Sequence, residues 1–315
     1  MRSFLFVAVQ QPEPTARLIR ASARASATVL LDLEDALWDV TDEMRTSTLK
    51  AAGREDLVTL ARSRQELFES QPIGVRVNRV SGPEAEHDFE ALGRASRFVE
   101  LECIVLPKLE TELDLVDCLA AIRTHKVACR SIVPIVETRR AMANLGELLV
   151  AFRRAGIEWV VYGHYDLGLD SGWWPFPEHN EPAFWDHVEP LIARIEAAGL
   201  RYVHPPYFHI HDDAGLARIL ARLRHVCRRE FGILTIGLQQ ASMASRLREG
   251  GGLPGAEPEG TPADDPVALA RRIADAYLTT QRPGVGFALD PRTGEFISPH
   301  LYLAARDYLR KVAHG

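Results

Sequence analysis

The chain has 315 residues, of which 46 % are hydrophobic and 25 % are charged, and its formal net charge at pH 7 is −6. This composition is ordinary for a globular enzyme, and the lack of a basic block argues against a nucleic-acid-binding protein. No apolar run approaches the length of a membrane span, and the N-terminal FLFVAV is too short for the core of a signal peptide.

Eight short apolar runs rich in Val, Ile and Leu recur along the chain, and segments with helical periodicity lie between them. Strands that alternate with helices predict parallel crossover units, and eight such units predict a closed (β/α)8 TIM barrel. A doubly wound sheet is the alternative, but its glycine-rich first turn is replaced here by QQPEPTA. The expected strands are 2–9, 28–34, 72–78, 103–110, 131–137, 158–167, 201–208 and 232–239.

Three stretches follow from this pattern. The barrel is expected to occupy residues 1–248 as the catalytic domain. Residues 249–266 are dense in Gly, Pro and acidic residues without an apolar period, so they predict a loop. Residues 267–315 contain two segments with helical periodicity and predict a short C-terminal helical extension.

The four cysteines show neither CxxC pairing nor the spacing of a metal site. Free thiols in a reducing compartment are the simplest interpretation, which predicts a cytoplasmic protein. The four are Cys103, Cys118, Cys129 and Cys227.

Polar side chains stand at the ends of most expected strands. Because barrel enzymes place their catalytic groups at the C-terminal ends of the strands, these residues are expected to meet at one mouth of the barrel. Where two of them are spaced i and i+2, both point to the same face. The set comprises Asp32 with Glu34, Arg76 with Asn78, Lys108 with Glu110, then Glu137, Asp166, His204 and Gln239.

This set is acidic, and crowded carboxylates repel each other unless a cation or a proton lies between them. Oxygen ligands from widely spaced strands, without Cys or clustered His, suit a hard ion such as Mg²⁺. Glu137 and Asp166 are the predicted metal ligands, with structural salt bridges to Arg or Lys as the alternative. Arg76 is predicted to hold a substrate carboxylate, with a plain ion pair to Glu34 or Asp32 as the alternative.

The chain resembles the HpcH/HpaI aldolase and citrate lyase family, specifically the branch of the citrate lyase β subunit and the malyl-CoA lyases. The motifs that carry the resemblance follow in the family's order and cover most of the chain. They are RSFLFV, LLDLEDAL, VRVN, LPKLE, IVETRRAMAN, GHYDL and the C-terminal GVGFALDPRTGEFISPHLYLAAR.

The resemblance implies a (β/α)8 barrel, often trimeric, that cleaves or forms carbon–carbon bonds next to a carbonyl with Mg²⁺. Carried over by motif, Glu137 and Asp166 match the metal ligands, and Arg76 matches the arginine that holds the substrate carboxylate. Glu34 and Asp35 match acids that support the site. Mg²⁺ chelated by a 2-oxo acid polarises the carbonyl and stabilises the enolate that C–C cleavage leaves.

Several positions depart from the family pattern. Ala8 and Val9 replace a Pro-Gly turn, and a lysine usual near Asp42 is missing, so the use of a CoA thioester is uncertain. His164 and Tyr165 replace small residues before Asp166.

The C-terminal segment departs as well. The acid that usually precedes its last helix, in some members an acid or base that reaches into a neighbouring subunit, is Ser298 here. The usual Ile-His-Pro near the eighth strand is replaced by TIGLQQ. Asp290 or Glu295 could replace the missing acid, and the sequence does not choose between them.

Two other patterns suggest different chemistry. His204, His209 and His211 stand close to two aspartates and could form a two-His-one-carboxylate metal site, or be pocket and loop histidines. Lys108 could form a Schiff base, as in lysine-dependent aldolases, but the nearby Glu110 favours a charged lysine.

The sequence therefore predicts a Mg²⁺-dependent carbon–carbon lyase or aldolase, with Mn²⁺ as the alternative ion. Its substrate is expected to be a small carboxylate or a 3-hydroxyacyl compound, and its partner a second copy of the chain in a trimer or hexamer. The alternatives are an acyl-CoA thioesterase or a malate-synthase-like condensing enzyme on the same site, or a non-catalytic metal- and ligand-binding homologue.

Overall fold

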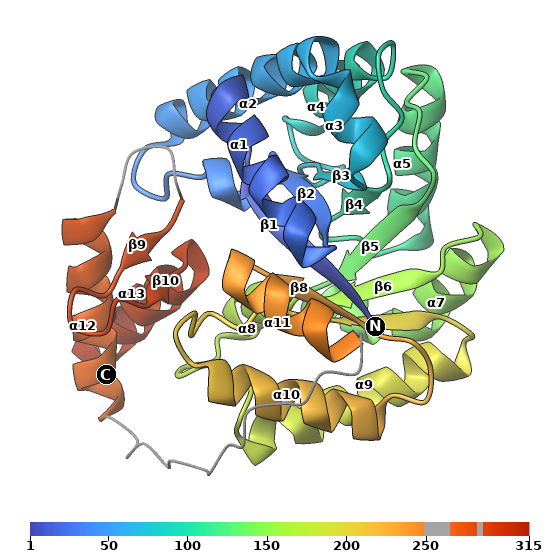
Figure 1. Ribbon diagram of the computed structural model, residues 1–315. Helices are drawn as coiled ribbons and strands as arrows, with labels where there is room; N and C mark the ends of the chain where they lie inside the picture. Colours follow the sequence, from blue (N-terminus) through green and yellow to red (C-terminus); the bar gives the residue numbers. More distant parts are fainter. Residues whose placement is uncertain (249–264, 282–285, 315) are drawn as a thin grey trace.

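The computed structural model describes residues 1–248, 265–281 and 286–314. Eight parallel strands pair in chain order and close into a barrel through the pairing of the first strand with the eighth (Figure 1). The strands are β1 (Arg2–Ala8), β2 (Thr28–Asp32), β3 (Ile73–Arg76), β4 (Ile104–Leu106), β5 (Ile132–Val136), β6 (Trp159–Tyr162), β7 (Arg201–His204) and β8 (Gly232–Thr235). The predicted TIM barrel is confirmed, and every strand lies inside the run that predicted it.

Helices surround the barrel on its outer face (Figure 1). Four of the seven connections between consecutive strands hold one α-helix and three hold two, and a 3-10 turn stands before β2 and another after it. The α-helices of the barrel are α1 (Pro12–Ser22), α2 (Glu43–Ser63), α3 (Gln65–Ser70), α4 (Ala85–Ala95), α5 (Glu112–Thr124), α6 (Arg139–Ala143), α7 (Leu145–Arg154), α8 (His164–Ser171), α9 (Pro182–Ala197), α10 (Asp213–Val226) and α11 (Leu238–Arg248). The 3-10 turns are η1 (Ala23–Ala25) and η2 (Asp35–Leu37).

Both faces of the strands are buried, which explains why the sequence shows continuous apolar runs rather than alternation. Successive side chains point to opposite faces of a strand. Val161 therefore fills the barrel interior with Phe4 and Trp159, whereas Val160 packs under the helices. The rings of Phe4 and Trp159 meet edge to face at 6.1 Å. The interior is a packed core, so a ligand can reach only the mouth.

The C-terminal extension lies to one side of the barrel (Figure 1). It contains α12 (Pro266–Thr280), a hairpin of β9 (Ala288–Leu289) and β10 (Phe296–Ile297), and α13 (Pro299–His314), which packs against α8. Both predicted helices are confirmed. The hairpin was not predicted, because strands of two residues leave no periodic signal.

The boundary before α12 lies one residue earlier than expected. Pro266 is the first helical residue, and the side chain of Asp265 caps the helix by accepting a hydrogen bond from the Ala268 N–H at 3.0 Å. Residues 249–264 of the predicted loop lie outside the described residues.

The described residues contain no helix that is both long and apolar enough to cross a membrane. All four cysteines are free thiols; Cys103 and Cys118 are buried. Burial raises the pKa of both of these thiols to about 12, so neither is a reactive thiolate near neutral pH.

Candidate active site

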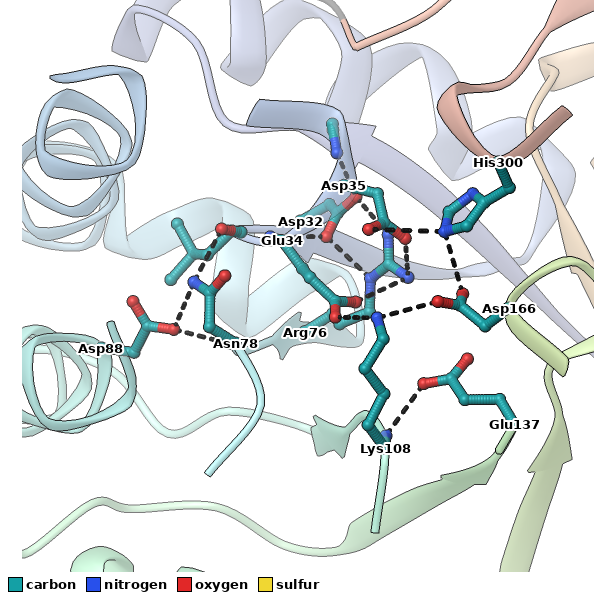
Figure 2. A network of polar contacts seen from close by, with 12 residues as sticks. Asp32, Glu34, Asp35, Arg76, Asn78, Asp88, Lys108, Glu137, Asp166 and His300 are labelled. Carbon is teal, nitrogen blue, oxygen red and sulfur yellow. Dashed lines mark hydrogen bonds and ion pairs between the residues drawn. The ribbon is translucent and has the colours of Figure 1, made fainter. Parts of the chain in front are cut away.

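The turn after β2 is held by Asp32. Its carboxylate accepts hydrogen bonds from the backbone N–H groups of Glu34 and Ala36, both at 3.0 Å. These bonds fold the chain sharply into η2 and direct Glu34 and Asp35 toward the mouth of the barrel (Figure 2). Asp32 thus holds the turn in place, and it lines the cavity together with Asp35.

Arg76, the last residue of β3, is buried among the three acids. Its Nε and Nη2 contact the two oxygens of Asp32 at 2.8 and 2.6 Å. Its Nη1 lies 2.9 Å from Asp35 Oδ2 and 3.0 Å from Glu34 Oε2. Burial alone would lower the pKa of Arg76, but the carboxylates outweigh it and raise that pKa.

The bidentate edge of Arg76 is therefore occupied by Asp32. The ion pair that the sequence offered as an alternative is present, and a grip on a substrate carboxylate stays a prediction. Such a grip would have to use the hydrogens of Nη1 and Nη2 that donate to no acid, or displace one acid.

Lys108 links the acids of β2 to those of β5 and α8. Its φ of 53° is left-handed, which is uncommon for a residue with a Cβ and concentrates at functional sites. This conformation lets its N–H donate to Glu137 Oε1 at 2.9 Å while its Nζ lies 2.7 Å from Glu34 Oε1 and 3.0 Å from Asp166 Oδ1 (Figure 2).

The charge state of Lys108 bears on whether this lysine could form a Schiff base. Burial lowers the pKa of its ammonium, but Asp166 and Glu34 outweigh burial, so the pKa lies above its ordinary value. A Schiff base requires a neutral amine. The lysine-dependent aldolase interpretation is therefore disfavoured, and Lys108 is a fixed cation of the site.

His300, the second residue of α13, reaches the same cluster from the C-terminal extension. Its Nε2 lies 3.2 Å from Asp166 Oδ2 and 4.0 Å from Asp35 Oδ1, and its ring meets Trp38 edge to face at 5.6 Å. Sequence reasoning missed this residue. The available signal was its place two residues after Ser298, in the segment where the resemblance expects an acid.

The two acids offered as substitutes for the missing carboxylate do not line the pocket. Asp290 forms an ion pair with Arg272, and Glu295 Oε1 lies 2.5 Å from His209 Nδ1. Ser298 does line the pocket, together with His300. Neither Asp290 nor Glu295 replaces the missing acid at the cavity, because each is paired with another side chain outside it.

The cluster fits a divalent cation. Five carboxylates, of Asp32, Glu34, Asp35, Glu137 and Asp166, are opposed by only two permanent cations, Arg76 and Lys108. Burial and then repulsion by Asp35 raise the pKa of Glu34 to about 7. Burial, with repulsion by Asp166, also raises the pKa of Glu137. Buried acids whose negative charge is not fully compensated are what a hard oxygen-bound ion requires.

The donor atoms are also close enough to share an ion. Asp35, Asp166 and His300 each offer one ligand atom, and these atoms lie within 4.8 Å of one another. Glu137 directly follows β5, and its carboxylate points toward Asp166 (Figure 2). The predicted pair of Glu137 and Asp166 thus faces one space, and Asp35 and His300 extend the set of candidate ligands.

Gly163 makes room for Glu137. A Cβ at position 163 would lie 2.3 Å from Glu137 Oε2, well inside van der Waals contact. We therefore expect Gly163→Ala to move the Glu137 carboxylate and to lower Mg²⁺ affinity about tenfold or more, as measured by titration calorimetry.

The matched control is Gly146→Ala in α7, where a new Cβ meets nothing within 4 Å. This change should leave Mg²⁺ affinity unaltered and raise the free energy of unfolding by roughly 0.5–1 kcal/mol. Equal Mg²⁺ affinity in Gly163→Ala and wild type would argue against Glu137 as a ligand.

The histidine-rich segment after β7 does not form a metal site. Among the described residues, Asp35, Asp166 and His300 are the only group of three such side chains with ligand atoms so close together. His209 instead lies between two acids, with Nε2 3.1 Å from Glu178 and Nδ1 2.5 Å from Glu295. The two-His-one-carboxylate interpretation is therefore wrong, because His209 pairs with Glu178 and Glu295, and no close group of ligand atoms among the described residues includes His209 or His211.

His204 belongs to a buried group with His164 and His179. Its Nε2 lies 3.2 Å from His179 Nδ1, and its Nδ1 lies 3.2 Å from the Tyr202 hydroxyl. Burial lowers the pKa of His164 to about 4 and that of His204 to about 3. Both rings are thus neutral in the folded protein near neutral pH.

This burial predicts a contribution of His204 to stability that disappears in acid. Below pH ~6.5 the unfolded chain binds a proton at this residue and the folded chain does not, so stability is lost as pH falls. Between pH 6.5 and 4.5 we expect the free energy of unfolding of His204→Gln to fall by about 2 kcal/mol less than that of wild type, as measured by urea denaturation.

The comparison with wild type is essential, because the raised pKa values of Glu34 and Glu137 act with the opposite sign in the same range. Exposed His225, at the end of α10, supplies the control substitution His225→Gln. A pH dependence in His204→Gln that matches wild type would contradict the assignment of a buried neutral His204.

A cavity of about 220 Å³ opens beside the acid cluster. Asp32, Asp35, Arg76, Glu137, Asp166 and His300 form its polar end. Tyr165, which the sequence analysis identified as a departure, lines the cavity and narrows it. Of the Ala8–Val9 pair that replaces a Pro-Gly turn, Ala8 lines the cavity and Val9 is buried in the core.

The sequence also matches a family model. The model described as HpcH/HpaI aldolase/citrate lyase covers residues 2–224, more than half of the chain. A comparison with curated proteins finds no match.

Several solved structures share the fold. A Haloferax volcanii malate synthase, solved as a ternary complex with pyruvate and acetyl-CoA, has a TM-score of 0.71 and 17 % identity over 100 % of this chain and 91 % of that one. A citrate lyase β subunit from Mycobacterium tuberculosis, complexed with oxaloacetate and magnesium, has a TM-score of 0.54 and 20 % identity over 77 % of this chain and 95 % of that one. The M. tuberculosis protein CitE, with magnesium, acetoacetate and coenzyme A, has a TM-score of 0.56 and 20 % identity over 99 % and 98 % of the two chains. At such identities the likeness shows the fold alone.

Proposed function

Because the chain belongs to the HpcH/HpaI aldolase/citrate lyase family of lyase- and aldolase-type enzymes, we propose that it makes or breaks a carbon–carbon bond next to a carbonyl. The substrate is a small carboxylate, and the reaction depends on Mg²⁺. The observation that carries the proposal is the surplus of buried carboxylates over cations at the barrel mouth. Without a cation this arrangement is electrostatically costly, and a stable fold keeps it only where the charge has a use.

Asp166 and Glu137 are the residues that would hold the ion, with Asp35 and His300 beside them. When bound, Mg²⁺ supplies a Lewis acid that polarises a carbonyl oxygen and compensates negative charge that develops there. A donor set of carboxylate oxygens and one imidazole nitrogen is also compatible with Mn²⁺. The resemblance to structures that contain magnesium supports the choice of Mg²⁺.

The chain's own cations have distinct tasks in this proposal. Lys108, fixed between Glu34 and Asp166, presents a positive charge to the region where a cleaved substrate gains negative charge. Arg76 holds Asp32, Glu34 and Asp35 in position and orients the substrate carboxylate. Packing of the extension over α8 brings His300 to Asp166 and excludes water from that side.

The test is proton exchange at the carbon next to the carbonyl. The full chain with Mg²⁺ in D2O should accelerate deuterium incorporation into at least one 2-oxo acid above a blank without protein, as followed by NMR. Chelation of the metal with EDTA should remove the acceleration. If no 2-oxo acid exchanges faster than the blank, the lyase or aldolase assignment fails.

Condensation is the second candidate. The malate synthase that resembles this chain over its whole length was solved with pyruvate and acetyl-CoA, and condensation uses the same activated carbon in the opposite direction. Release of free CoA from acetyl-CoA only in the presence of a 2-oxo acid would indicate condensation. Release without one would indicate the thioesterase alternative, and binding without either reaction would indicate a non-catalytic homologue.

A further inference from the structure

Apart from the acid cluster, the wall of the cavity is mainly apolar. Side chains from five strands or the loops after them line this part of the cavity, and the C-terminal extension supplies two more, one just before β9 and one in β10. These lining residues are Phe6, Ile135, Val161, Phe208, Leu234, Ile236, Phe287 and Phe296, with Tyr165 from α8. A catalytic site with one polar end and one apolar wall fixes the orientation of its ligand.

Four aromatic rings form a continuous row along this wall. Tyr165 and Phe208 lie with ring centroids 4.3 Å apart, Phe208 and Phe287 6.0 Å apart, and Phe287 and Phe296 5.8 Å apart. All four side chains are only half-buried, so part of each ring remains open to the cavity. The hydroxyl of Tyr165 is turned away to the Pro206 carbonyl at 3.4 Å, which leaves the ring to face the ligand space.

None of the described residues that line the cavity is a cation free to bind a second anionic group. Among its described lining residues, Arg76 is the one permanent cation, and it already contacts Asp32, Glu34 and Asp35. Lys108, beside the cavity, is held by Glu34 and Asp166. A second substrate carboxylate turned toward the aromatic row would lose hydration without gaining a partner.

The volume is compatible with a ring-sized substituent. An apolar cavity of about 150 Å³ is large enough to bind benzene. The present cavity has about 220 Å³ in total, its polar end included, which is larger than the volume that holds a benzene ring.

We propose that this site takes a 2-oxo acid whose substituent is an uncharged aryl or branched alkyl group, in preference to a dicarboxylate. The inference rests on the proposed function, because it assumes that the 2-oxo acid end lies at the acid cluster. It adds the substrate class: the aromatic row of Tyr165, Phe208, Phe287 and Phe296 selects the rest of the molecule.

The test compares four 2-oxo acids with the full chain in the presence of Mg²⁺. Phenylpyruvate and 4-methyl-2-oxopentanoate should bind at least about tenfold more tightly than pyruvate and oxaloacetate in titration calorimetry, since each buries an apolar group on the aromatic row. Equal or tighter binding of oxaloacetate or pyruvate overturns the inference, and so does the absence of binding by all four acids.

Deuterium exchange on the same four acids separates this inference from the proposed function. Exchange without any apolar preference in binding leaves the proposed function standing and overturns the substrate class. A clear apolar preference in binding, with no exchange of any acid, supports the substrate class and refutes catalysis of enolisation.

A matched pair of variants tests whether the aromatic row is responsible for the preference for apolar substituents. Phe296→Ala shortens the row and should lower phenylpyruvate affinity about tenfold while changing pyruvate affinity less than twofold. Phe98→Ala makes the same chemical change at an exposed ring outside the cavity and should alter neither affinity. Because Phe296 belongs to a short hairpin, Phe208→Ala provides a second truncation on a different segment. Unchanged phenylpyruvate affinity in both cavity variants overturns the assignment of the row.

Discussion

Asp166→Asn is expected to lower Mg²⁺ affinity at least about hundredfold and to remove metal-dependent exchange. Even residues that only support a metal ligand cost 10–100-fold when replaced, so loss of a direct carboxylate ligand should cost about that much or more. The substitution keeps the size of the side chain but removes the charge that lies 3.0 Å from Lys108 Nζ and 3.2 Å from His300 Nε2. Titration calorimetry with MgCl2 measures the affinity, and NMR in D2O measures the exchange.

Asp170→Asn is the control for this experiment. Asp170 lies one turn later on the same helix α8, is exposed, and accepts a hydrogen bond from the Arg139 N–H at 2.7 Å. Its replacement should leave Mg²⁺ affinity and exchange unchanged. Full Mg²⁺ affinity in a folded Asp166→Asn protein would exclude Asp166 as a ligand and would remove the basis of the proposed metal site.

Arg76→Met is expected to lower the free energy of unfolding by about 3–5 kcal/mol, the usual cost of removing one partner from a buried ion pair. The variant leaves Asp32, Glu34 and Asp35 without their shared cation, in a place where Arg76 is only 7 % exposed. Methionine keeps an apolar stem but lacks the guanidinium, whose carbon lies 4.5 Å from the centroid of the Phe6 ring, so the loss includes this cation–π contact along with the ion pairs. Urea denaturation in EDTA measures it.

Arg94→Met provides the exposed counterpart. Arg94 also contacts both oxygens of one carboxylate, at 2.6 and 2.8 Å from Glu55, but it lies on the surface between α4 and α2. Surface ion pairs contribute less than about 1 kcal/mol, so this variant should unfold close to wild type. If both arginine variants lose equally little stability, the acids around Arg76 have found another cation or have become protonated.

Much of the fold was readable in the sequence because it depends on local patterns. Runs such as TVLLD and IVPIV are buried on both faces, so each one predicted a strand without knowledge of its neighbours. The regular alternation with helical segments then predicted the barrel. The expected strands were longer than the observed ones. The apolar runs were read as far as the polar residues Glu34, Asn78 and Lys108, but these residues lie beyond the last paired residue of their strands.

The site was predictable only in part. Barrel topology places strand ends at one mouth, which is why Glu34, Arg76, Glu137 and Asp166 could be grouped from their positions alone. Their roles as ligands and substrate contacts stay predictions. The sequence did not show which of Asp32, Glu34 and Asp35 has which role. That depends on which carboxylate contacts Arg76 and which accepts hydrogen bonds from the backbone of the turn.

Three sets of side-chain contacts at the site could be seen only in the tertiary structure. Lys108 joins Glu34 to Asp166 through a left-handed backbone that no local pattern signals. His300 reaches Asp166 across 134 positions of the sequence because α13 packs against α8. The aromatic row assembles Tyr165, Phe208 and two residues of the C-terminal extension from segments that are remote in sequence.

The sequence by itself thus determined the barrel, its order of strands and the acidic character of its mouth, since burial periodicity and strand ends are local properties of the chain. Only the tertiary structure decided which cation meets which acid and what surrounds the cavity. Those outcomes depend on packing between elements that are far apart along the chain, and side-chain contacts at such range leave no trace in spacing or composition.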